Sequence, residues 1–301
     1  MYTNISFFDF QKLFSTEDDC RKYLFKRRWP NDFECPKCSC KNFSYISSRK
    51  LYQCCNCRYQ CSLIVDTIFE KSKTPLLKWF WMIFLIANQK NGCAALELKR
   101  LLSISYKTAL YMTHKIRTAM AARDARYKLA GLVEMDDSYF GGKNHPGKRG
   151  RGSENKTTVI VGVQLTKNNK PLYTNMITVE NMKEKNIKKT VKEHVMEKSL
   201  ITTDGYSSYK VLKRYNYEHI PLVVDEPKQA SKLLPWVHTI IANVKGNIRG
   251  THHGVSSKHL QRYLAEFTYR MNRRFSMDQL FDRLLTACIL AQPVTVAEVS
   301  T

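Results

Sequence analysis

The chain has 301 residues, and its 49 Lys and Arg against 26 Asp and Glu give a formal net charge of +23. That length allows two or three domains, one of them with a substantial core. Because the positive charge is spread along the chain and not confined to one tail, it indicates a polyanionic partner. The longest apolar run, residues 79–87, is too short to cross a bilayer, so we expect no membrane partner.

The cysteines gather in one short stretch. Seven of the ten lie between Cys35 and Cys61, and no charged-then-apolar signal segment opens the chain. Such clustering favours metal binding over disulfides. We therefore expect a protein of a reducing compartment, the cytoplasm.

Residues 1–34 are typical of a short helical lead-in, and residues 35–64 of a zinc ribbon. The ribbon contains two C-x-x-C knuckles separated by fifteen residues, a spacing that suits four thiolates around a tetrahedral, structural Zn²⁺. The ligands that this spacing predicts are Cys35, Cys38, Cys54 and Cys57. A set that uses Cys40 or Cys55 remains an alternative, and Cys61 is left over.

Residues 65–125 are expected to be helical. Thr74 and Pro75 look like the cap and first turn of a buried helix. Residues 92–120 have the outline of a helix-turn-helix, with a first helix at 94–102, a turn, and a second helix capped by Ser105. The side chains best placed to touch DNA bases are Tyr106, Lys107 and Tyr111. The second helix is also expected to carry His114, Lys115 and Arg117 outward, although two ordinary packed helices would give the same pattern.

Two carboxylates in the second half of the chain follow short strands. Residues 131–137 predict a strand that places Glu134 and Asp136 on one face, and the strand at Leu200 runs into Asp204. Carboxylates at strand ends that are distant in sequence can assemble an oxygen-ligand site for Mg²⁺. Alternatively, each Asp merely marks a strand end or caps a turn.

The order of predicted elements gives an α/β class for residues 130–290. Strands at 157–165 and 171–179 form a meander with the first strand, and a helix at 181–196, the strand ending at Asp204, a helix at 206–214, a strand near 219–223 and a final helix follow. This is the order of the ribonuclease-H-like architecture. In it, carboxylates from the first and fourth strands and a residue on a later helix meet at one edge.

Two segments of this half are rich in basic residues. Residues 143–156 contain Gly, Pro and five basic residues, so they should form an exposed loop suited to DNA phosphates. Residues 256–275 predict one helix with an apolar stripe and several arginines beside it. The DNA-backbone contacts predicted in these segments are Lys148, Arg149, Arg151, Arg273 and Arg274.

Several of these motifs also carry a family resemblance. VEMDDSYFGG, TTDGYSSY, the tail HTIIANVKGNIRGTHHGVSSKHLQRYLAEFTYRMNRRF and the CPKC/CCNC ribbon together resemble the ISXO-like insertion-sequence transposases, a zinc-ribbon group of the DDE superfamily. The resemblance spans nearly all of residues 10–285. It implies that Asp136 and Asp204 are the first two catalytic acids, that Asn243 is the third member in place of the usual Glu, and that Lys245 accompanies it. The adjacent Asp137 is not an expected ligand.

The resemblance implies a DNA transposase that binds terminal inverted repeats, cleaves the ends and joins them to target DNA by two-metal phosphoryl transfer with Mg²⁺ or Mn²⁺. Two ends must be held together, so at least a homodimer is expected. A different class of function is a non-catalytic DNA-binding regulator derived from a transposase. A stand-alone structure-selective nuclease would use the same site without end specificity.

Overall fold

The computed structural model describes residues 5–141, 156–223, 233–295 and 297–298, which form two compact units. The first unit joins residues 1–123 to residues 275–301, and the second is continuous over residues 124–274. The second unit is therefore inserted into the first along the sequence. This division differs from the expected domain at 130–290, because residues 275–290 belong to the first unit.

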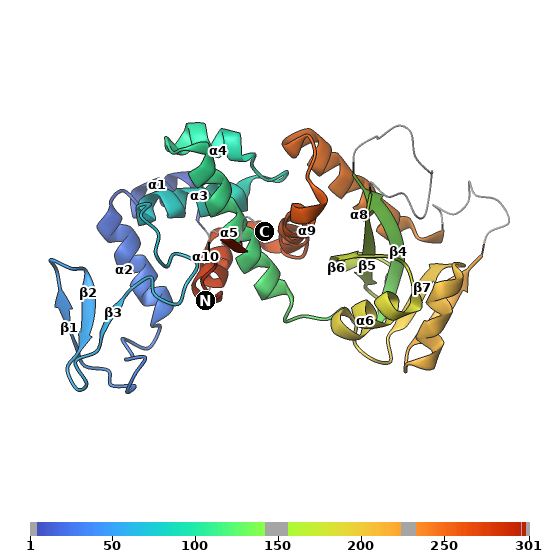
Figure 1. The fold of residues 1–301 in the computed structure, drawn as a ribbon, viewed down its shortest axis with the longest axis horizontal. Coiled ribbons are helices and arrows are strands. Elements are labelled where there is room, and N and C mark those ends of the chain that lie inside the picture. Colours follow the sequence, from blue (N-terminus) through green and yellow to red (C-terminus); the bar gives the residue numbers. More distant parts are fainter. Residues whose placement is uncertain (1–4, 142–155, 224–232, 296, 299–301) are drawn as a thin grey trace. The chain divides into compact units, whose positions relative to one another are not determined.

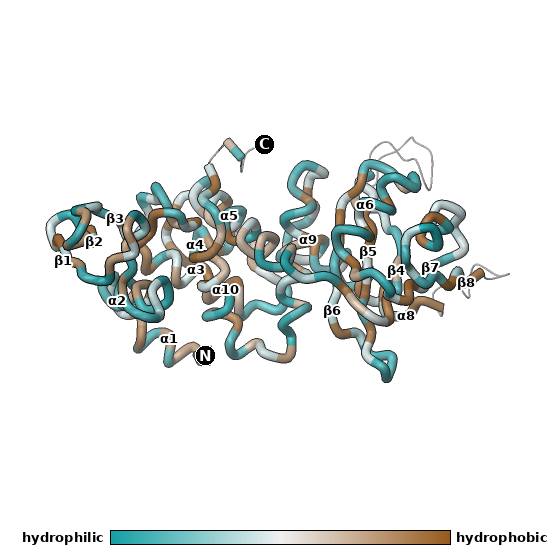
Figure 2. The backbone as a smooth tube through the Cα atoms, turned by 90° about the horizontal axis from the view of Figure 1, so that it is seen from below, coloured by the Kyte–Doolittle hydropathy of each residue, from teal (hydrophilic) through white to brown (hydrophobic). Residues whose placement is uncertain are grey.

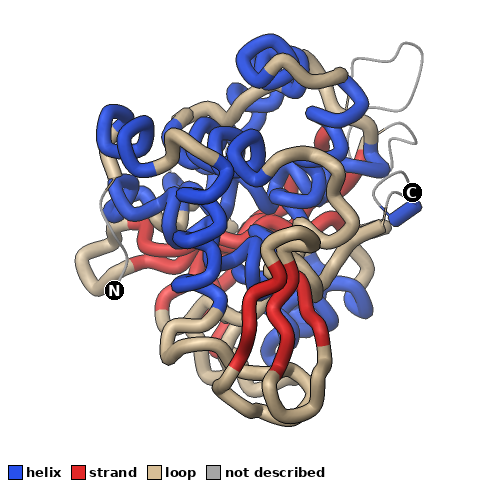
Figure 3. The backbone as a smooth tube through the Cα atoms, turned by 90° about the vertical axis from the view of Figure 1, so that its left-hand side faces the viewer, coloured by secondary structure: helices blue, strands red, loops and turns tan. Residues whose placement is uncertain are grey.

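The first unit is mostly helical and also carries a small sheet (Figure 1). Its helices are α1 (Phe7–Leu13), α2 (Glu17–Arg28), α3 (Leu76–Asn88), α4 (Ala95–Leu102), α5 (Tyr106–Asp124) and α10 (Leu280–Leu290). Its sheet consists of β1 (Phe43–Ile46), β2 (Leu51–Cys54) and β3 (Gln60–Ser62), each antiparallel to the next. The three short strands face the viewer in Figure 3.

Helix α10 joins the first unit because its side chains complete that unit's core. The Phe281 ring lies 5.1 Å from the Phe10 ring, centroid to centroid. The fully buried Asp282 accepts a hydrogen bond of 3.0 Å from the Tyr23 hydroxyl and forms an ion pair with Arg27. A buried carboxylate is tolerated when it is paired and hydrogen-bonded in this way. The C-terminal helix is therefore fixed to α2 and not to the predicted catalytic domain.

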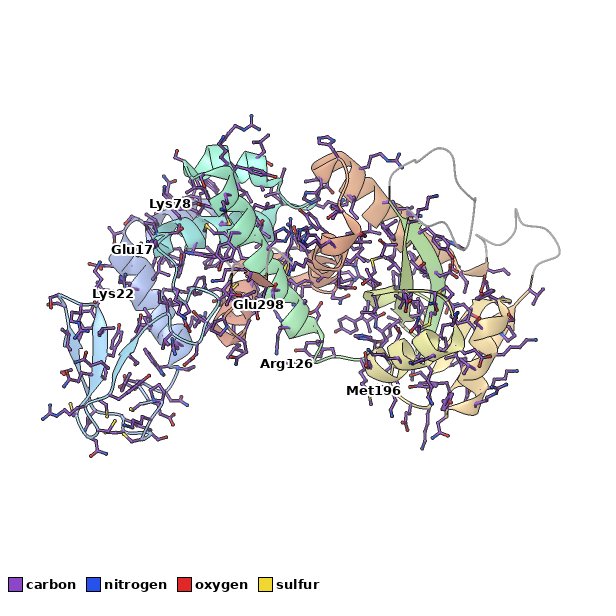
Figure 4. All side chains as sticks on the ribbon, viewed as in Figure 1. Glu17, Lys22, Lys78, Arg126, Met196 and Glu298 are labelled. Atoms are coloured by element: carbon purple, nitrogen blue, oxygen red, sulfur yellow. The ribbon has the colours of Figure 1, made fainter. Side chains whose placement is uncertain are left out.

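Helix α3 begins at Leu76, and its N-terminus is capped from another helix. Glu17, at the start of α2, is labelled in Figure 4. Its carboxylate accepts hydrogen bonds from the backbone N–H groups of Leu76 and Leu77, each 3.0 Å long. Pro75 occupies the N-cap position, and no bond from a local side chain caps the helix there, so the predicted cap by Thr74 is wrong. A carboxylate at this position satisfies N–H groups that have no partner within the helix.

The second unit contains a five-stranded sheet in the order β6-β5-β4-β7-β8. The strands are β4 (Leu132–Phe140), β5 (Thr157–Leu165), β6 (Pro171–Val179), β7 (Leu200–Asp204) and β8 (Glu218–Leu222). The first three pair antiparallel, whereas β7 is parallel to β4 and β8 is parallel to β7. This is the strand order of the ribonuclease-H-like fold, which confirms the predicted architecture.

Helical segments pack on both faces of this sheet. They are α6 (Glu184–His194), η1 (Ser207–Arg214), α8 (Pro235–Asn247), η3 (Ile248–His252) and α9 (Ser257–Met271), followed at the boundary with the first unit by η4 (Arg274–Gln279). Alternate residues of β4 serve the two faces. Val133 and Met135 share a buried cluster with Val191 of α6, and Phe140 shares another with Val237 and residues of α9. Helix α6 buries only a narrow stripe and is hydrophilic over most of its length (Figure 2).

Candidate active site and zinc ribbon

The four cysteines predicted as zinc ligands lie together in the first unit. The sulfur atoms of Cys35, Cys38, Cys54 and Cys57 are all within 4.8 Å of one another. The Cys35–Cys57 and Cys38–Cys54 sulfur pairs are each 3.6 Å apart. Tetrahedral zinc with bonds of about 2.3 Å requires sulfur pairs about 3.8 Å apart, so the four thiols fit a structural Zn²⁺. The backbone N–H groups of Cys57 and Asn56 contribute to lowering the pKa of Cys54 to about 6, which favours the thiolate.

The remaining ribbon cysteines lie outside this cluster. The Cys40 thiol points to the carbonyl oxygen of Asn42, 3.9 Å away, and Cys55 is exposed. Cys61 is buried, and burial raises the pKa of its thiol. The alternative ligand sets that use Cys40 or Cys55 are therefore not those that the fold assembles.

Asp136 and Asp204 occupy neighbouring positions on two parallel strands. The register of β4 and β7 pairs Met135 with Thr203, so the next residues on the two strands are the two aspartates. Adjacent strands are about 4.8 Å apart, and residues in register point to the same face of the sheet. Both carboxylates thus lie on the face that carries Glu134. The structure brings together the first two predicted acids and places Asp137 on the opposite face.

Each aspartate is held by a nearby backbone group. Asp136 is buried, and its Oδ1 accepts a hydrogen bond of 2.8 Å from the N–H of Asp137. Asp204 is half-buried, and its Oδ1 accepts one of 3.2 Å from the N–H of Tyr206. These bonds use one oxygen of each carboxylate and favour defined side-chain orientations.

Glu134 fixes helix α8 over this face of the sheet. Its Oε2 accepts hydrogen bonds from the backbone N–H groups of Trp236 and Val237, at 3.0 and 2.8 Å. Both N–H groups lie in the first turn of α8, where a carboxylate is favoured by the helix dipole. Burial raises the pKa of Glu134, and the two hydrogen bonds oppose that shift. Glu134 thus anchors the helix that supplies the remaining site residues.

His238 is the residue of α8 that meets Asp136. Its Nδ1 lies 3.6 Å from Oδ2 of Asp136. Lys245 follows seven residues later, only about 20° further around a regular helix, and its ammonium lies 5.3 Å from the centroid of the Phe140 ring. Burial lowers the pKa of Lys245, Lys156 lowers it further, and Asp136 raises it. His238 and Lys245 therefore lie along one side of α8, facing β4.

Asn243, the predicted third member, has different surroundings. It is exposed, and it lies about 140° around α8 from His238. Two residues on a helix that are separated by two positions do not share a face, so Asn243 and Lys245 diverge. His238 was missed in the sequence, although its spacing of two helical turns from Lys245 is a signal for a shared face.

The buried His219 is linked to the backbone of Asp204 through the Thr203 hydroxyl. The Thr203 hydroxyl donates to the backbone carbonyl of Asp204 at 2.7 Å, and its oxygen lies 2.9 Å from Nε2 of His219. Because the Thr203 hydroxyl already donates, it accepts from Nε2–H of His219, so the imidazole is neutral and carries its proton on Nε2. Its Nδ1 is buried and has no hydrogen-bond partner in the described part of the chain. Burial lowers the pKa of His219, and Lys213 adds to this.

Helices α4 and α5 lie at the predicted positions in the sequence, with Ser105 as the cap of α5, and a helix-turn-helix stays a prediction. The Ser105 hydroxyl accepts a hydrogen bond of 3.0 Å from the N–H of Thr108. Tyr106 and Lys107 are exposed at the start of α5, as DNA contact requires. Tyr111 is half-buried, and its hydroxyl donates to the carbonyl of Val294 at 3.0 Å. Contact of these three residues with DNA stays a prediction.

Three basic residues of α5 do not point outward. His114, Lys115 and Arg117 are each at most 3% exposed, so their predicted orientation is wrong. The Lys115 ammonium lies 5.2 Å from the centroid of the Tyr111 ring and 5.9 Å from that of Trp79. Aromatic faces attract cations, which lets a basic residue lie inside this helical unit.

Arg273 and Arg274 have partners within the second unit. Arg273 forms an ion pair of 2.7 Å with Asp124 and stacks at 3.6 Å on the Tyr269 ring. Arg274 donates to the carbonyls of Leu172 and Met271 at 2.9 and 2.8 Å, and also to that of Pro171. Contact of Arg273 and Arg274 with the DNA backbone stays a prediction. The other predicted backbone contacts, Lys148, Arg149 and Arg151, lie outside the described residues.

Neither unit offers a bilayer-spanning segment: of the helices described, none is both long and apolar enough. The paired aspartates on a ribonuclease-H-like sheet, together with a four-cysteine ribbon, define the class: a zinc-ribbon protein with a ribonuclease-H-like domain. Comparison with known families agrees. An ISXO2-like transposase domain matches residues 128–272, and a transposase zinc-ribbon domain matches residues 15–60. The chain thus contains an ISXO2-like transposase domain preceded by a transposase zinc-ribbon domain.

One curated relative is an uncharacterized protein in the transposable element ISH50 of Halobacterium salinarum. It is 25% identical over 219 residues, which cover 67% of this chain and 71% of the relative.

Solved structures with some likeness include a simian T-cell lymphotropic virus intasome chain, at 14% identity and a TM-score of 0.32. The match covers 58% of this chain and 64% of that one. The Mos1 mariner paired-end complex with Mn matches at 12% identity and a TM-score of 0.29, over 64% of this chain and 73% of that one. These likenesses are distant, and nothing about this chain follows from them.

Proposed function

We propose that this protein is a DNA transposase that cuts the ends of its element and joins them to target DNA at the site formed by Asp136, Asp204 and the α8 residues facing them. The observation that carries the proposal is the register of β4 and β7, which sets the two aspartates side by side on one face. A single aspartate at a strand end is common, whereas two in register beneath a helix that carries His238 and Lys245 match a phosphoryl-transfer site.

The donor set fits a hard divalent cation. Two carboxylates from adjacent parallel strands offer hard oxygen donors on one face of the sheet, the kind of ligand that Mg²⁺ or Mn²⁺ prefers. We propose His238 as the third member, since it meets Asp136, and Asn243 as the weaker candidate. A bound cation would supply Lewis-acid activation of the phosphate and of the attacking water or 3′ hydroxyl.

Lys245 is proposed to bind a DNA phosphate next to the aspartates. Its ammonium is half-buried, and burial penalises its charge unless an anion is present. A phosphate at this place would supply that anion and would keep the scissile strand in reach of Asp136. Asp136 and Asp204 orient the reacting groups, and no covalent protein–DNA intermediate is required.

The net charge of +23 supports binding to DNA over an extended surface. Tyr106 and Lys107 at the start of α5 and the basic segment at 143–156 are proposed contacts with the element's ends. At least two copies of the chain would hold two ends together. Affinity for DNA should fall steeply as salt is added, because each phosphate contact releases counterions.

The test is a strand-transfer assay with Mg²⁺ or Mn²⁺ on DNA that carries the element's ends. Asp136→Ala and Asp204→Ala should abolish cleavage and joining while leaving DNA binding intact. Asp137→Asn is the matched control, because Asp137 is the next residue on the same strand but lies on the opposite face.

A wild-type protein as inert as the Asp136→Ala variant would contradict the enzymatic proposal and favour a non-catalytic DNA-binding regulator. Cutting without preference for the ends would favour a structure-selective nuclease. Loss of activity in Asp137→Asn equal to that in Asp136→Ala would show that the site is wrongly placed.

A further inference from the structure

The two faces of the ribbon sheet, β1, β2 and β3, have opposite surroundings. The register pairs Phe43 with Cys54 and Tyr52 with Cys61, so these residues share one face. That face is covered by aromatic residues of α2 and the segment after it. The Phe25 ring, for example, lies 5.1 Å from the Tyr52 ring.

The other face carries a row of polar side chains across all three strands. The register aligns Ser44 with Gln53 and Gln53 with Gln60. Gln60 donates through Nε2 to Oε1 of Gln53 at 3.0 Å, and Arg49 donates through Nη1 to Oε1 of Gln60 at 3.0 Å. We call this surface, made of Ser44, Gln53, Gln60 and Arg49, the open face. Each of its residues is exposed or half-buried.

The bonds within the open face hold its amides in position while leaving capacity for a ligand. Gln53 keeps both N–H donors of its amide and the second lone pair of its oxygen. Arg49 keeps four of its five donors. Leu51 and Ile46 are half-buried at the hairpin end of the same face and add apolar surface. The combination of an amide, a guanidinium and apolar groups is the set that recognises adenine, guanine and the thymine methyl group.

Charge around the open face selects a polyanion. The sequence from Cys35 to Val65 contains five basic residues and no Asp or Glu. The basic residues are Lys37, Lys41, Arg49, Lys50 and Arg58, and all of them are exposed. A surface of this composition attracts phosphates and repels basic partners.

We propose that the open face enters the major groove of duplex DNA and recognises base edges there, with Gln53 and Arg49 as the residues that determine specificity. The major groove, about 12 Å wide, admits a two-stranded β-ribbon, so β2 and β3 can present the paired Gln53 and Gln60 to base edges there. The exposed Lys41 and Lys50, which flank β1 in the sequence, are the expected phosphate contacts. The inference rests on the proposed function in one respect, namely that the partner is DNA.

The experiment uses the full chain and a duplex that the wild-type protein selects from a random-sequence pool, with a scrambled duplex of equal length as the reference. Gln53→Ala/Gln60→Ala and Arg49→Ala should each reduce the ratio of selected to scrambled affinity by about tenfold or more. Lys41→Ala is the matched control, an exposed basic residue of the ribbon outside the open face. It should weaken binding to both duplexes equally and reduce the salt dependence by about one phosphate contact.

Zinc content and far-UV circular dichroism show whether each variant keeps its fold. A folded Gln53→Ala/Gln60→Ala protein with an unchanged affinity ratio would overturn the proposal. An equal loss of affinity for both duplexes would also overturn it and would show that these residues contact only the DNA backbone. The Asp136→Ala variant should select the same sequence as wild type, so failure of the catalytic proposal would not be mistaken for failure of this one.

Discussion

Nδ1 of His238 lies 3.6 Å from Oδ2 of Asp136, which makes α8 part of the site through a residue five positions before Asn243. We expect His238→Ala to reduce strand transfer by about 100-fold, as loss of one group that stabilises developing charge does. Asn243→Ala should stay close to wild type, because Asn243 is exposed on another side of the helix. The measurement is the rate on pre-cleaved ends at several Mn²⁺ concentrations. The opposite ranking of the two variants would favour Asn243 over His238 as the third member.

Glu134 should control the position of α8. Removal of its carboxylate in Glu134→Ala leaves the N–H groups of Trp236 and Val237 without their acceptor and should cost about 2 kcal/mol locally. Hydrogen exchange of residues 235–247 would then be faster. Glu134→Gln keeps an acceptor oxygen and should show a smaller change. Equal protection of the α8 amides in wild type and Glu134→Ala would contradict this role.

Zinc binding should be required for folding of the zinc ribbon and not for folding of the other parts of the chain. Cys35→Ser or Cys57→Ser removes one of four clustered thiols, so the bound zinc should fall from one per chain toward zero and the ribbon should unfold. Metal analysis after gel filtration measures this. Cys55→Ser is the control, since Cys55 is exposed and lies outside the cluster. A Cys55→Ser protein without zinc, or a Cys57→Ser protein with a full equivalent, would mean that the ligand set is wrong.

The second unit should lose stability in mild acid, partly through His219. Burial lowers the pKa of His219 in the folded state below its usual value of 6.5, so the unfolded state binds its proton first as pH falls. The contribution is fully present above pH 6.5 and is lost as pH falls through the folded-state pKa. His194 is shifted in the same direction by burial and should add to the effect.

This is measured by urea unfolding of wild type and His219→Gln between pH 7.5 and 5.5. The variant should show the shallower dependence on pH. Zinc loss affects both proteins alike and cancels in the comparison. If the free energy of unfolding depends on pH equally in both proteins, His219 does not contribute to the loss of stability in acid.

Arg273 should matter for folding more than for DNA binding. Arg273→Ala removes the ion pair with Asp124 and the stacking on Tyr269, and should destabilise the second unit by about 3 kcal/mol. The salt dependence of DNA binding should not change. Lys258→Ala, at an exposed position of α9, should leave stability unaltered. An Arg273→Ala protein of normal stability with one phosphate contact fewer would instead support the original prediction of a DNA contact.

Predictions from the sequence succeeded where they used a regular period, as in a strand, or a short spacing between residues of one motif. Alternation along residues 131–137 put Asp136 on the same face as Glu134, and the strand ending at residue 204 placed Asp204. The two aspartates lie side by side because β4 and β7 are parallel and in register. The two C-x-x-C knuckles predicted the thiol cluster because their cysteines are close together in the sequence.

Features that depend on a contact between distant parts of the sequence could not be predicted from local patterns. Which side of α8 faces the sheet depends on Glu134 binding its N-terminus, about a hundred residues away in the chain. The burial of Lys115 depends on rings at Trp79 and Tyr111 that no periodicity indicates. The place of α10 depends on Asp282 meeting Arg27 and Tyr23 at the opposite end of the sequence.

The insertion of residues 124–274 between two parts of the first unit has a consequence for synthesis on the ribosome. Everything that builds the sheet and its aspartates has been translated before α10 emerges, whereas the helical unit must wait for Phe281 and Asp282 to fill its core. A premature stop codon just after residue 274 would therefore leave the second unit complete, with its sheet and both aspartates, and would deprive the first unit of α10.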